Sequence, residues 1–200
     1  MSRWAALAAL LVAVGAHAQT DAVVLVAKPD LVDSHFSGTV ILVTHAPSGD
    51  VVGVVLNRPT RLRLADVAPE FPHAAAYAER LYDGGPVLQR VIVALFRADA
   101  PPSAPAFRVS DDAYLSMHPA NITSLLERPQ ARFRLFAGFA GWAPGQLESE
   151  IARGSWYVLP ASADLLFRRE TSGMWRELVD KAQSRRAAAS PATRAIYLSS

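Results

Sequence analysis

The sequence predicts an α/β or α+β fold with a mixed β-sheet, and two patterns lead to this class. Short apolar runs rich in β-branched residues recur along the 200-residue chain, between segments of helical spacing. The first runs are joined by a hairpin turn instead of crossover helices, which argues against a doubly wound sheet. We expect about seven strands and about three to five helices in one domain, because 51% hydrophobic content suffices for a packed core.

Three buried strands are predicted near the start of the chain, over residues 23–27, 39–44 and 51–56. Each is an apolar run too short for a buried helix. The segment from His45 to Asp50 contains Pro47 and Gly49, which are typical of a hairpin turn between the second and third strands. Pro59 ends the third strand, because it lacks the N–H that a β-ladder needs.

The polar segment 30–38 is predicted to be a loop between the first two strands. Its apolar residues are expected to anchor it to the body of the protein: Leu31, Val32 and Phe36. After the third strand, the spacing of apolar residues predicts a helical turn over 62–67, and the alanine content favours a helix over 73–81.

The middle of the chain continues with a Gly-Gly-Pro turn that leads into a strand over 87–96. Three prolines exclude regular structure from the loop 99–105. Short strands are expected over 107–109 and 113–116, followed by a helix over 119–128 that Pro129 stops.

A strand over 132–140 is predicted from strict alternation of its side chains. Phe133, Leu135, Ala137 and Phe139 lie on one face, which we expect to be buried. Arg132 and Arg134 lie on the other face, whose first part should be in water.

A glycine-rich corner follows this strand. Gly141 allows a reversal, and Pro144 is suited to the first position of a helix over 144–153 that Gly154 can close. Leu147 and Ile151 pair one turn apart on this helix. The remaining elements are expected to be a strand over 155–159, a turn or short helix over 161–167, and a helix over 174–182.

The chain begins with the three parts of a secretory signal peptide. One arginine precedes an apolar run from Trp4 to Val14, and residues 16–18 form an A-x-A site. The run is too short to cross a bilayer, so we expect cleavage after Ala18 and a periplasmic or secreted product. If this interpretation is wrong, the protein is cytoplasmic. The predicted organisation is therefore a signal peptide over 1–18, one domain over 19–184 and a basic, disordered tail over 185–200.

Composition excludes several classes of site. The chain has no cysteine, which removes disulfides, thiolate nucleophiles and zinc–thiolate sites. Seven basic residues face three acidic ones after position 167, so the positive charge belongs to the tail and not to a folded surface. This distribution is not typical of a nucleic-acid binder, and no later segment is apolar enough to span a membrane. We expect a monomer.

Four stretches, taken together and in this order, resemble the AlgH/YqgE family of bacterial proteins: LVAKPDLVDSHF, VVGVVLNRPT, YDGGPV and GFAGWAPGQLE, with the WYVLP strand behind the last. The resemblance covers about residues 24–175 and implies a compact, partly barrel-like sheet surrounded by helices. It implies no established biochemical activity, although some members carry the label of transcriptional regulator. The family's characteristic positions fall on Pro29, Asp33, Phe36, His45, Gly49, Gly53, Asn57, Arg58, Pro59, Gly84, Gly85, Pro86, Gly138, Gly141, Trp142, Gly145, Gln146, Leu147 and Glu148.

The chain departs from the family pattern in three places. Asp33-Ser34-His35-Phe36 stands where the family usually has Asp-Pro-x-Phe, and the hairpin after His45 is one residue longer. A signal peptide is unusual for this family, and it argues against a role in transcription.

Polar residues of these motifs at predicted strand ends and turn edges are the candidate ligand-binding residues: Asp33, His45, Asn57, Arg58, Trp142, Gln146 and Glu148. One hypothesis is that they converge on a pocket floored by Trp142, where Arg58 offers a charged fork to a small polar or anionic ligand. Each could instead cap a turn or form a surface pair.

Catalytic and metal motifs are missing from the sequence. No histidine pair has metal-ligand spacing, and no G-x-S-x-G or S-x-x-K occurs. We therefore predict no catalytic residue, no metal and no cofactor. A non-catalytic interaction or regulatory module, working with an unknown protein partner, is ranked first. A small-ligand binder is second, and a transcriptional regulator is last.

Overall fold

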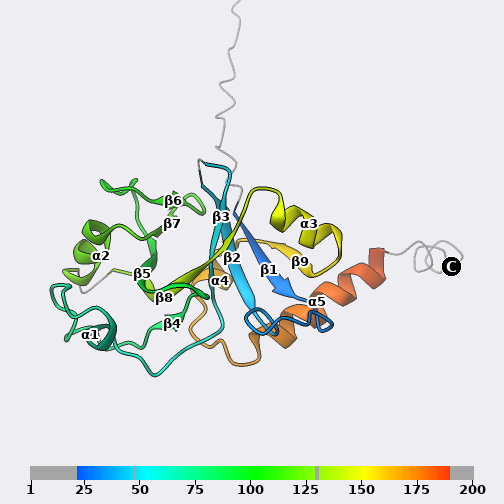
Figure 1. Cartoon of the computed structure of the whole chain (residues 1–200), viewed down its shortest axis with the longest axis horizontal. Helices are drawn as coiled ribbons and strands as arrows, with labels where there is room; N and C mark the ends of the chain where they lie inside the picture. The colour runs from blue at the N-terminus through cyan, green and yellow to red at the C-terminus, as the bar shows by residue number, and fades with distance from the viewer. Residues whose placement is uncertain (1–21, 47, 129–130, 190–200) are drawn as a thin grey trace, which may run out of the picture.

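One curled β-sheet organises the protein (Figure 1). The computed structural model describes residues 22–189 except 47 and 129–130. The described elements, in chain order, are β1 (Val23–Ala27), β2 (Val40–His45), β3 (Val51–Val55), α1 (Leu64–Val67), β4 (Tyr82–Asp83), β5 (Val87–Arg97), β6 (Phe107–Arg108), β7 (Ala113–Ser116), α2 (Pro119–Leu126), β8 (Phe133–Trp142), α3 (Gln146–Ala152), β9 (Trp156–Pro160), α4 (Ala163–Leu166) and α5 (Met174–Ala189).

The strands are ordered β6-β7-β5-β8-β3-β2-β1-β9, and every neighbouring pair along this path is antiparallel. Strand β4 lies off the path and pairs in parallel with β8. The sheet is mixed through this one pairing. Strand β8 belongs to both halves of the sheet, since it pairs with β5 over residues 133–139 and with β3 over residues 140–142. Side chains of the two halves share one enclosed core. The α/β or α+β class predicted from the sequence is confirmed.

The first strands are apolar at nearly every position because both of their faces are buried. Val24 and Val26 point into the core enclosed by the two halves of the sheet, whereas Leu25 and Ala27 belong to a second cluster on the opposite face. Strand β2 divides its side chains in the same way.

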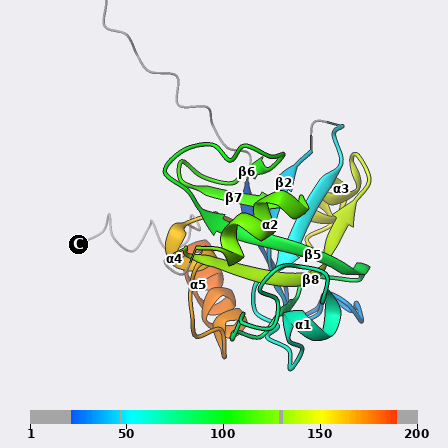
Figure 2. The same ribbon diagram turned by 90° about the vertical axis from the view of Figure 1, so that its left-hand side faces the viewer.

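Helices and one loop cover the sheet. Helices α4 and α5 contribute to the enclosed core, and α5 lies against β1 (Figures 1 and 2). Helices α1 and α2 pack over the outer face of β5, β7 and β8. Helix α3 and the loop between β1 and β2 pack over the outer face of β1, β2 and β3.

Two glycines allow the β4 segment to cross β8 at close range. A side chain at Gly84 would clash with the backbone carbonyl of Gly138, and a side chain at Gly138 would meet the carbonyl oxygens of Gly85 and Val87. Only hydrogen atoms fit between these two backbones. The Gly-Gly-Pro turn and the glycine-rich end of β8 therefore form one structural unit.

The strand predictions are confirmed to within two residues at each end, and the antiparallel hairpin of β2 and β3 is present. The helix predicted over 73–81 is wrong. His73 has a left-handed backbone with φ 62°, and turns follow it. A short alanine-rich segment has little stability as a helix without an apolar face to pack, and only Ala74 and Leu81 of this segment are buried.

The corner after β8 also differs from the prediction. Gly141 remains inside β8, paired with Val52. The chain turns later, and Gly145 occupies the N-cap of α3 with φ 78°, so Pro144 lies outside the helix. Leu147 is buried as expected, and Ile151 packs against the same cluster.

Two expectations about the C-terminal part need correction. Arg134 was expected in water but is only 7% exposed, because the chain after α4 passes over this face and the Arg168 carbonyl accepts a hydrogen bond from Arg134. The predicted tail starts too early, since α5 continues to Ala189. The predicted signal peptide lies outside the described residues, and none of the described helices is long and apolar enough to span a membrane.

Candidate functional site

The predicted site residues fall into three groups instead of one pocket. Asp33, Asn57 and Arg58 hold the loop between β1 and β2. Trp142 and Gln146 belong to a network around α3, and His45 pairs with Glu148. Within the described part of the chain, no hydrogen bond or ion pair joins one group to another.

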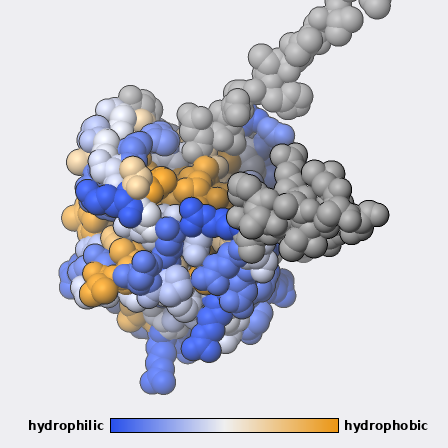
Figure 3. Space-filling model, turned by 90° about the vertical axis from the view of Figure 1, so that its right-hand side faces the viewer, coloured by the Kyte–Doolittle hydropathy of each residue, from blue (hydrophilic) through white to orange (hydrophobic). Residues whose placement is uncertain are grey.

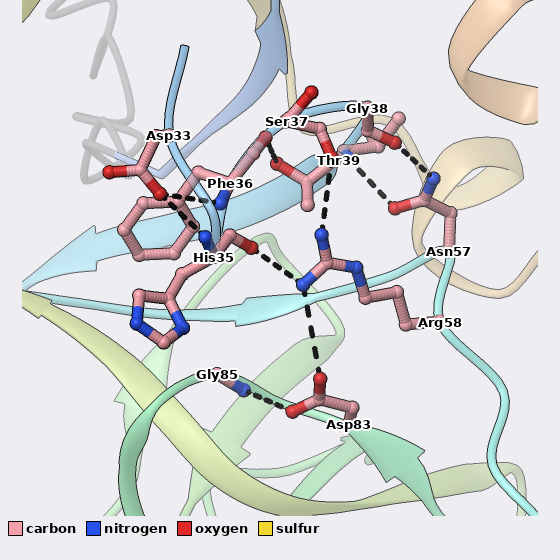
Figure 4. A network of polar contacts seen from close by, with 11 residues as sticks. Asp33, His35, Phe36, Ser37, Gly38, Thr39, Asn57, Arg58, Asp83 and Gly85 are labelled. Carbon is pink, nitrogen blue, oxygen red and sulfur yellow. Dashed lines mark hydrogen bonds and ion pairs between the residues drawn. The ribbon is translucent and has the colours of Figure 1, made fainter. Parts of the chain in front are cut away.

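Asp33 and Asn57 shape the loop that follows β1 (Figure 4). The Asp33 carboxylate accepts hydrogen bonds from the backbone N–H of His35 and of Phe36, at 2.7 and 2.8 Å. The Asn57 side chain accepts from Val40 N at 2.8 Å and donates to the Gly38 carbonyl at 3.0 Å. Both side chains therefore satisfy backbone groups, as Asp and Asn commonly do at turns.

Arg58 joins this loop to the last residue of β4. Its Nη1 donates to the His35 carbonyl at 2.5 Å and its Nη2 to the Ser37 carbonyl at 3.1 Å. The same Nη1 lies 3.9 Å from a carboxylate oxygen of Asp83. Asp83 in turn accepts from Gly85 N at 3.1 Å, so one guanidinium connects two segments that are distant in sequence (Figure 4).

The loop held in this way presents an apolar side chain to solvent. Phe36 faces inward and stacks on Trp142 with ring centroids 5.5 Å apart, and Leu31 packs beside it. Val32 was expected to be an anchor but is 99% exposed. Two anchors are sufficient, and the third apolar residue of the loop points away from the core.

The segment after the Gly-Gly-Pro turn presents a second exposed apolar side chain. Leu88 is 64% exposed and has φ 44°, a backbone conformation that is strained for a residue with a branched side chain. It lies where the pairing of β5 with β8 shifts register between Val87 and Ile92. The sequence prediction treated residues 87–96 as a regular strand and did not find this irregularity.

Two indoles and a carboxylate form the network around α3. One oxygen of Glu150 accepts hydrogen bonds from Nε1 of Trp142 and of Trp156, both at 3.0 Å. Its other oxygen accepts from Nε2 of Gln146 at 3.1 Å, and the Gln146 carbonyl oxygen accepts from Ala143 N. Sequence analysis missed Glu150, although its position one helical turn after Gln146 was a usable signal.

His45 and Glu148 are exposed, as is Gln146, but among the described residues the side chains of His45 and Glu148 form no hydrogen bond to the rest of the site. His45 Nε2 lies 3.7 Å from a carboxylate oxygen of Glu148, and the two side chains are 44% and 59% exposed. A pair in this position contributes little to stability, because water screens both charges.

A buried polar cluster lies elsewhere, where Arg134 stacks over the ring of Tyr82 at 4.4 Å. Burial lowers the pKa of Arg134. Burial also raises the pKa of Tyr77 above its ordinary value, and the negative charge of nearby Glu79 raises it further. The Tyr77 hydroxyl and the Arg134 Nη1 are buried and find no hydrogen-bond partner among the described residues. The Tyr77 ring stacks on Phe133, and both rings line a cavity of about 250 Å³.

A second cavity is wider, about 1190 Å³, and opens between α2 and the loop after β5. Its charged residues are Arg97, Arg128 and Arg132 against Asp99, Asp112 and Glu127, so neither sign dominates. None of the seven predicted site residues lines either cavity. In the described part of the chain, no group of three or more His, Asp or Glu side chains could hold a metal ion.

A family model described as AlgH-like (DUF179) matches residues 24–187, which include all three groups of predicted site residues. The chain belongs to the AlgH-like family. A UPF0301 protein of Thermobifida fusca (strain YX) is 34% identical over 164 residues, which cover 78% of this chain and 83% of that protein. A UPF0301 protein of Corynebacterium efficiens is 38% identical over 144 residues, 68% of this chain and 70% of the other.

Two solved structures share the AlgH-like fold. The solution structure of the AlgH protein from Pseudomonas aeruginosa matches with a TM-score of 0.62 at 25% identity, covering 84% of this chain and 86% of that one. A crystal structure from Corynebacterium diphtheriae matches with a TM-score of 0.60 at 29% identity, covering 78% and 83%. These comparisons confirm the family resemblance and the curled sheet with helices around it, and they attach no biochemical activity to the AlgH-like family.

Proposed function

We propose that this AlgH-like protein is a non-catalytic interaction module that binds another protein through a paired-loop surface. This surface consists of the loop 29–38 and the segment 84–91. The observation that carries the proposal is the position of Arg58, which bonds to the first loop and lies beside Asp83, whose carboxylate holds the backbone of Gly85 in the second segment. Each segment exposes an apolar side chain, Val32 at 99% and Leu88 at 64%. A regulatory role would act through the same contact.

The physical argument concerns the cost of binding. A flexible loop loses conformational entropy when a partner orders it, whereas a loop already fixed in its bound shape avoids that loss. Asp33, Asn57 and Arg58 fix the first loop through six hydrogen bonds to its backbone and to that of Val40. Exposed apolar side chains on a fixed support supply the favourable burial that a protein interface needs.

The test uses a photocrosslinking form of the full chain and three substitution variants. A photoreactive amino acid at position 32 should crosslink one partner in living bacteria, and Val32→Asp and Leu88→Asp should each abolish recovery of that partner in a pull-down. Leu62→Asp, on an exposed leucine outside both loops, is the matched control and should leave recovery unchanged. If Leu62→Asp reduces recovery as much as the two loop variants do, the surface is not specific.

We also infer from residues 1–18 that the module works in the cell envelope. Cell fractionation and N-terminal sequencing of the recovered protein test this inference. A mature chain that begins at Gln19 in the periplasmic fraction supports it. A full-length chain found only in the cytosol refutes export and leaves the interaction proposal standing.

Binding of a small polar or anionic ligand is the second candidate. The exposed polar atoms of His45 and Glu148, 3.7 Å apart, favour it. Ligand binding is placed second because Arg58, the expected ligand-binding cation, already donates through Nη1 and Nη2 to two backbone carbonyls of the protein. A thermal-shift screen against small anions and polar metabolites, with His45→Ala as the comparison, tests this candidate.

A further inference from the structure

Strand β9 is the longest open edge of the sheet. The strand order ends at β6 and β9; β6 has two residues and β9 has five. One side of β9 pairs with β1, and no described strand pairs with its other side. Backbone groups of a strand alternate between its two sides, so about half of the N–H and C=O groups of an edge strand lack a β-ladder partner.

One face of this edge is apolar. Val158 lies on the same face of β9 as Trp156 and is 44% exposed. Figure 3 shows apolar surface gathered between polar regions on the side of the molecule that carries α3, β9 and α5. A side chain of an added strand could cover Val158.

On the other face of the edge, two cations lie beside Tyr157. Tyr157 packs toward α5, with Lys28 Nζ at 5.4 Å and the Arg186 guanidinium carbon at 5.8 Å from the centre of its ring. Among the described residues, neither cation takes part in an ion pair. Arg186 comes from the last turn of α5, so two elements bring unpaired positive charge to the same strand.

We propose that β9 binds an extended acidic segment of a partner protein as an additional strand of the sheet. Residues directly opposite each other on neighbouring strands share a face. The segment therefore places an apolar side chain opposite Val158 and a carboxylate opposite Tyr157, within reach of Lys28 and Arg186. Its sequence alternates apolar and acidic residues, and its backbone pairs with the open groups of β9.

A second copy of this chain fits the same edge poorly. Pairing β9 with another β9 would bring a second Lys28 and a second Arg186 to the cations already present, and like charges repel. The edge is distinct from the paired-loop surface, so each proposal can fail without the other.

Selection from a library of random peptides on the immobilised full chain tests the proposal. The enriched peptides should alternate apolar and acidic residues. One enriched peptide, labelled with fluorescein, should then bind in fluorescence anisotropy, and Arg186→Glu should weaken that binding about tenfold or more at low salt. Arg176→Glu makes the same change of charge on α5, about 15 Å further along the helix axis, and should leave binding unchanged.

Hydrogen exchange provides the readout for the backbone. The bound peptide should slow exchange of β9 amides, since an added strand accepts hydrogen bonds from them. Three results would overturn the proposal: enriched peptides without the alternating pattern, equal weakening by Arg186→Glu and Arg176→Glu, or protection confined to elements other than β9. A dimer that Arg186→Glu dissociates would also overturn it, in favour of a second copy at this edge.

Discussion

Trp142 and Trp156 donate hydrogen bonds to the same carboxylate oxygen of Glu150, each at 3.0 Å. The two indole rings lie edge to face with centroids 6.4 Å apart, and Phe36 contacts both. One acidic side chain on α3 thus connects β8 and β9, and the loop after β1 packs on the two indoles through Phe36. The stability of this corner should depend on Glu150 more than on any predicted site residue of α3.

Replacing Glu150 by alanine should lower the free energy of unfolding by about 2–4 kcal/mol, because two buried indole N–H groups lose their charged acceptor. Urea denaturation followed by tryptophan fluorescence measures the loss. Glu150→Gln keeps an acceptor oxygen and should lose less. Glu148→Ala is the control on the same helix, and its stability should stay close to that of the wild type, since the His45 contact is exposed. Equal losses for Glu148→Ala and Glu150→Ala would contradict this account.

Replacing Arg58 by alanine should release the loop 29–38 while the sheet stays folded. Two backbone carbonyls lose their donors, which should cost about 1–2 kcal/mol of stability and accelerate exchange of the His35 and Phe36 amides. Hydrogen exchange followed by mass spectrometry resolves the loop from the strands. Arg61→Ala, on the exposed neighbouring arginine, should leave the exchange rates as they are. Unchanged exchange in Arg58→Ala would show that Asp33 and Asn57 hold the loop without it.

Replacing Tyr77 by phenylalanine should leave stability at neutral pH unchanged or raise it slightly, because the buried hydroxyl has no hydrogen-bond partner among the described residues. The pH dependence should also change. Burial raises the pKa of Tyr77, so above about pH 10 the unfolded state loses this proton while the folded state keeps it, and stability falls. Tyr77→Phe should lose less stability than the wild type between about pH 9 and 11, as measured by chemical denaturation at each pH. A parallel decline in both proteins would exclude Tyr77 as a cause.

Replacing Gly84 by alanine should destabilise the protein by about 3 kcal/mol or more, since the new methyl group would clash with the Gly138 carbonyl. Gly141→Ala is the matched control in β8. Its methyl group would meet its neighbours at 3.6 Å and beyond, an ordinary contact distance, and stability should change little. Thermal unfolding of the two variants checks the difference. A soluble Gly84→Ala protein with a wild-type melting temperature would show that the crossing can widen.

Much of the sheet could be predicted because the local sequence of each strand is typical of a buried strand. β1, β2 and β3 are apolar at nearly every position, and a run of that kind has few alternatives. The segment 73–81 had alanine content but no apolar stripe, so its propensity was overridden by the packing of Tyr77 against Phe133. Arg134 was wrongly expected in water, because its burial depends on the chain around Arg168, which comes several elements later in the sequence.

The sequence predicted where the candidate site residues lie along the strands, but it did not predict which groups they contact. Asn57 and Arg58 were found at the end of a strand, where functional side chains often lie. Their partners are backbone carbonyls and Asp83, which only the folded chain brings together. The position of Glu150 one helical turn after Gln146 was visible in the sequence, but its role was not, since nothing local shows that two tryptophans from different strands converge on it.

The crossing of Gly84 and Gly138 has a consequence for how the family can change. The nearest atoms to a side chain at either glycine belong to the main chain of the other segment, which no substitution can shrink. A substitution at one position therefore cannot be rescued by a single substitution at the other. The two motifs must be inherited together, and relatives in which one of them is lost should have rebuilt the entire path of the chain between β4 and β8.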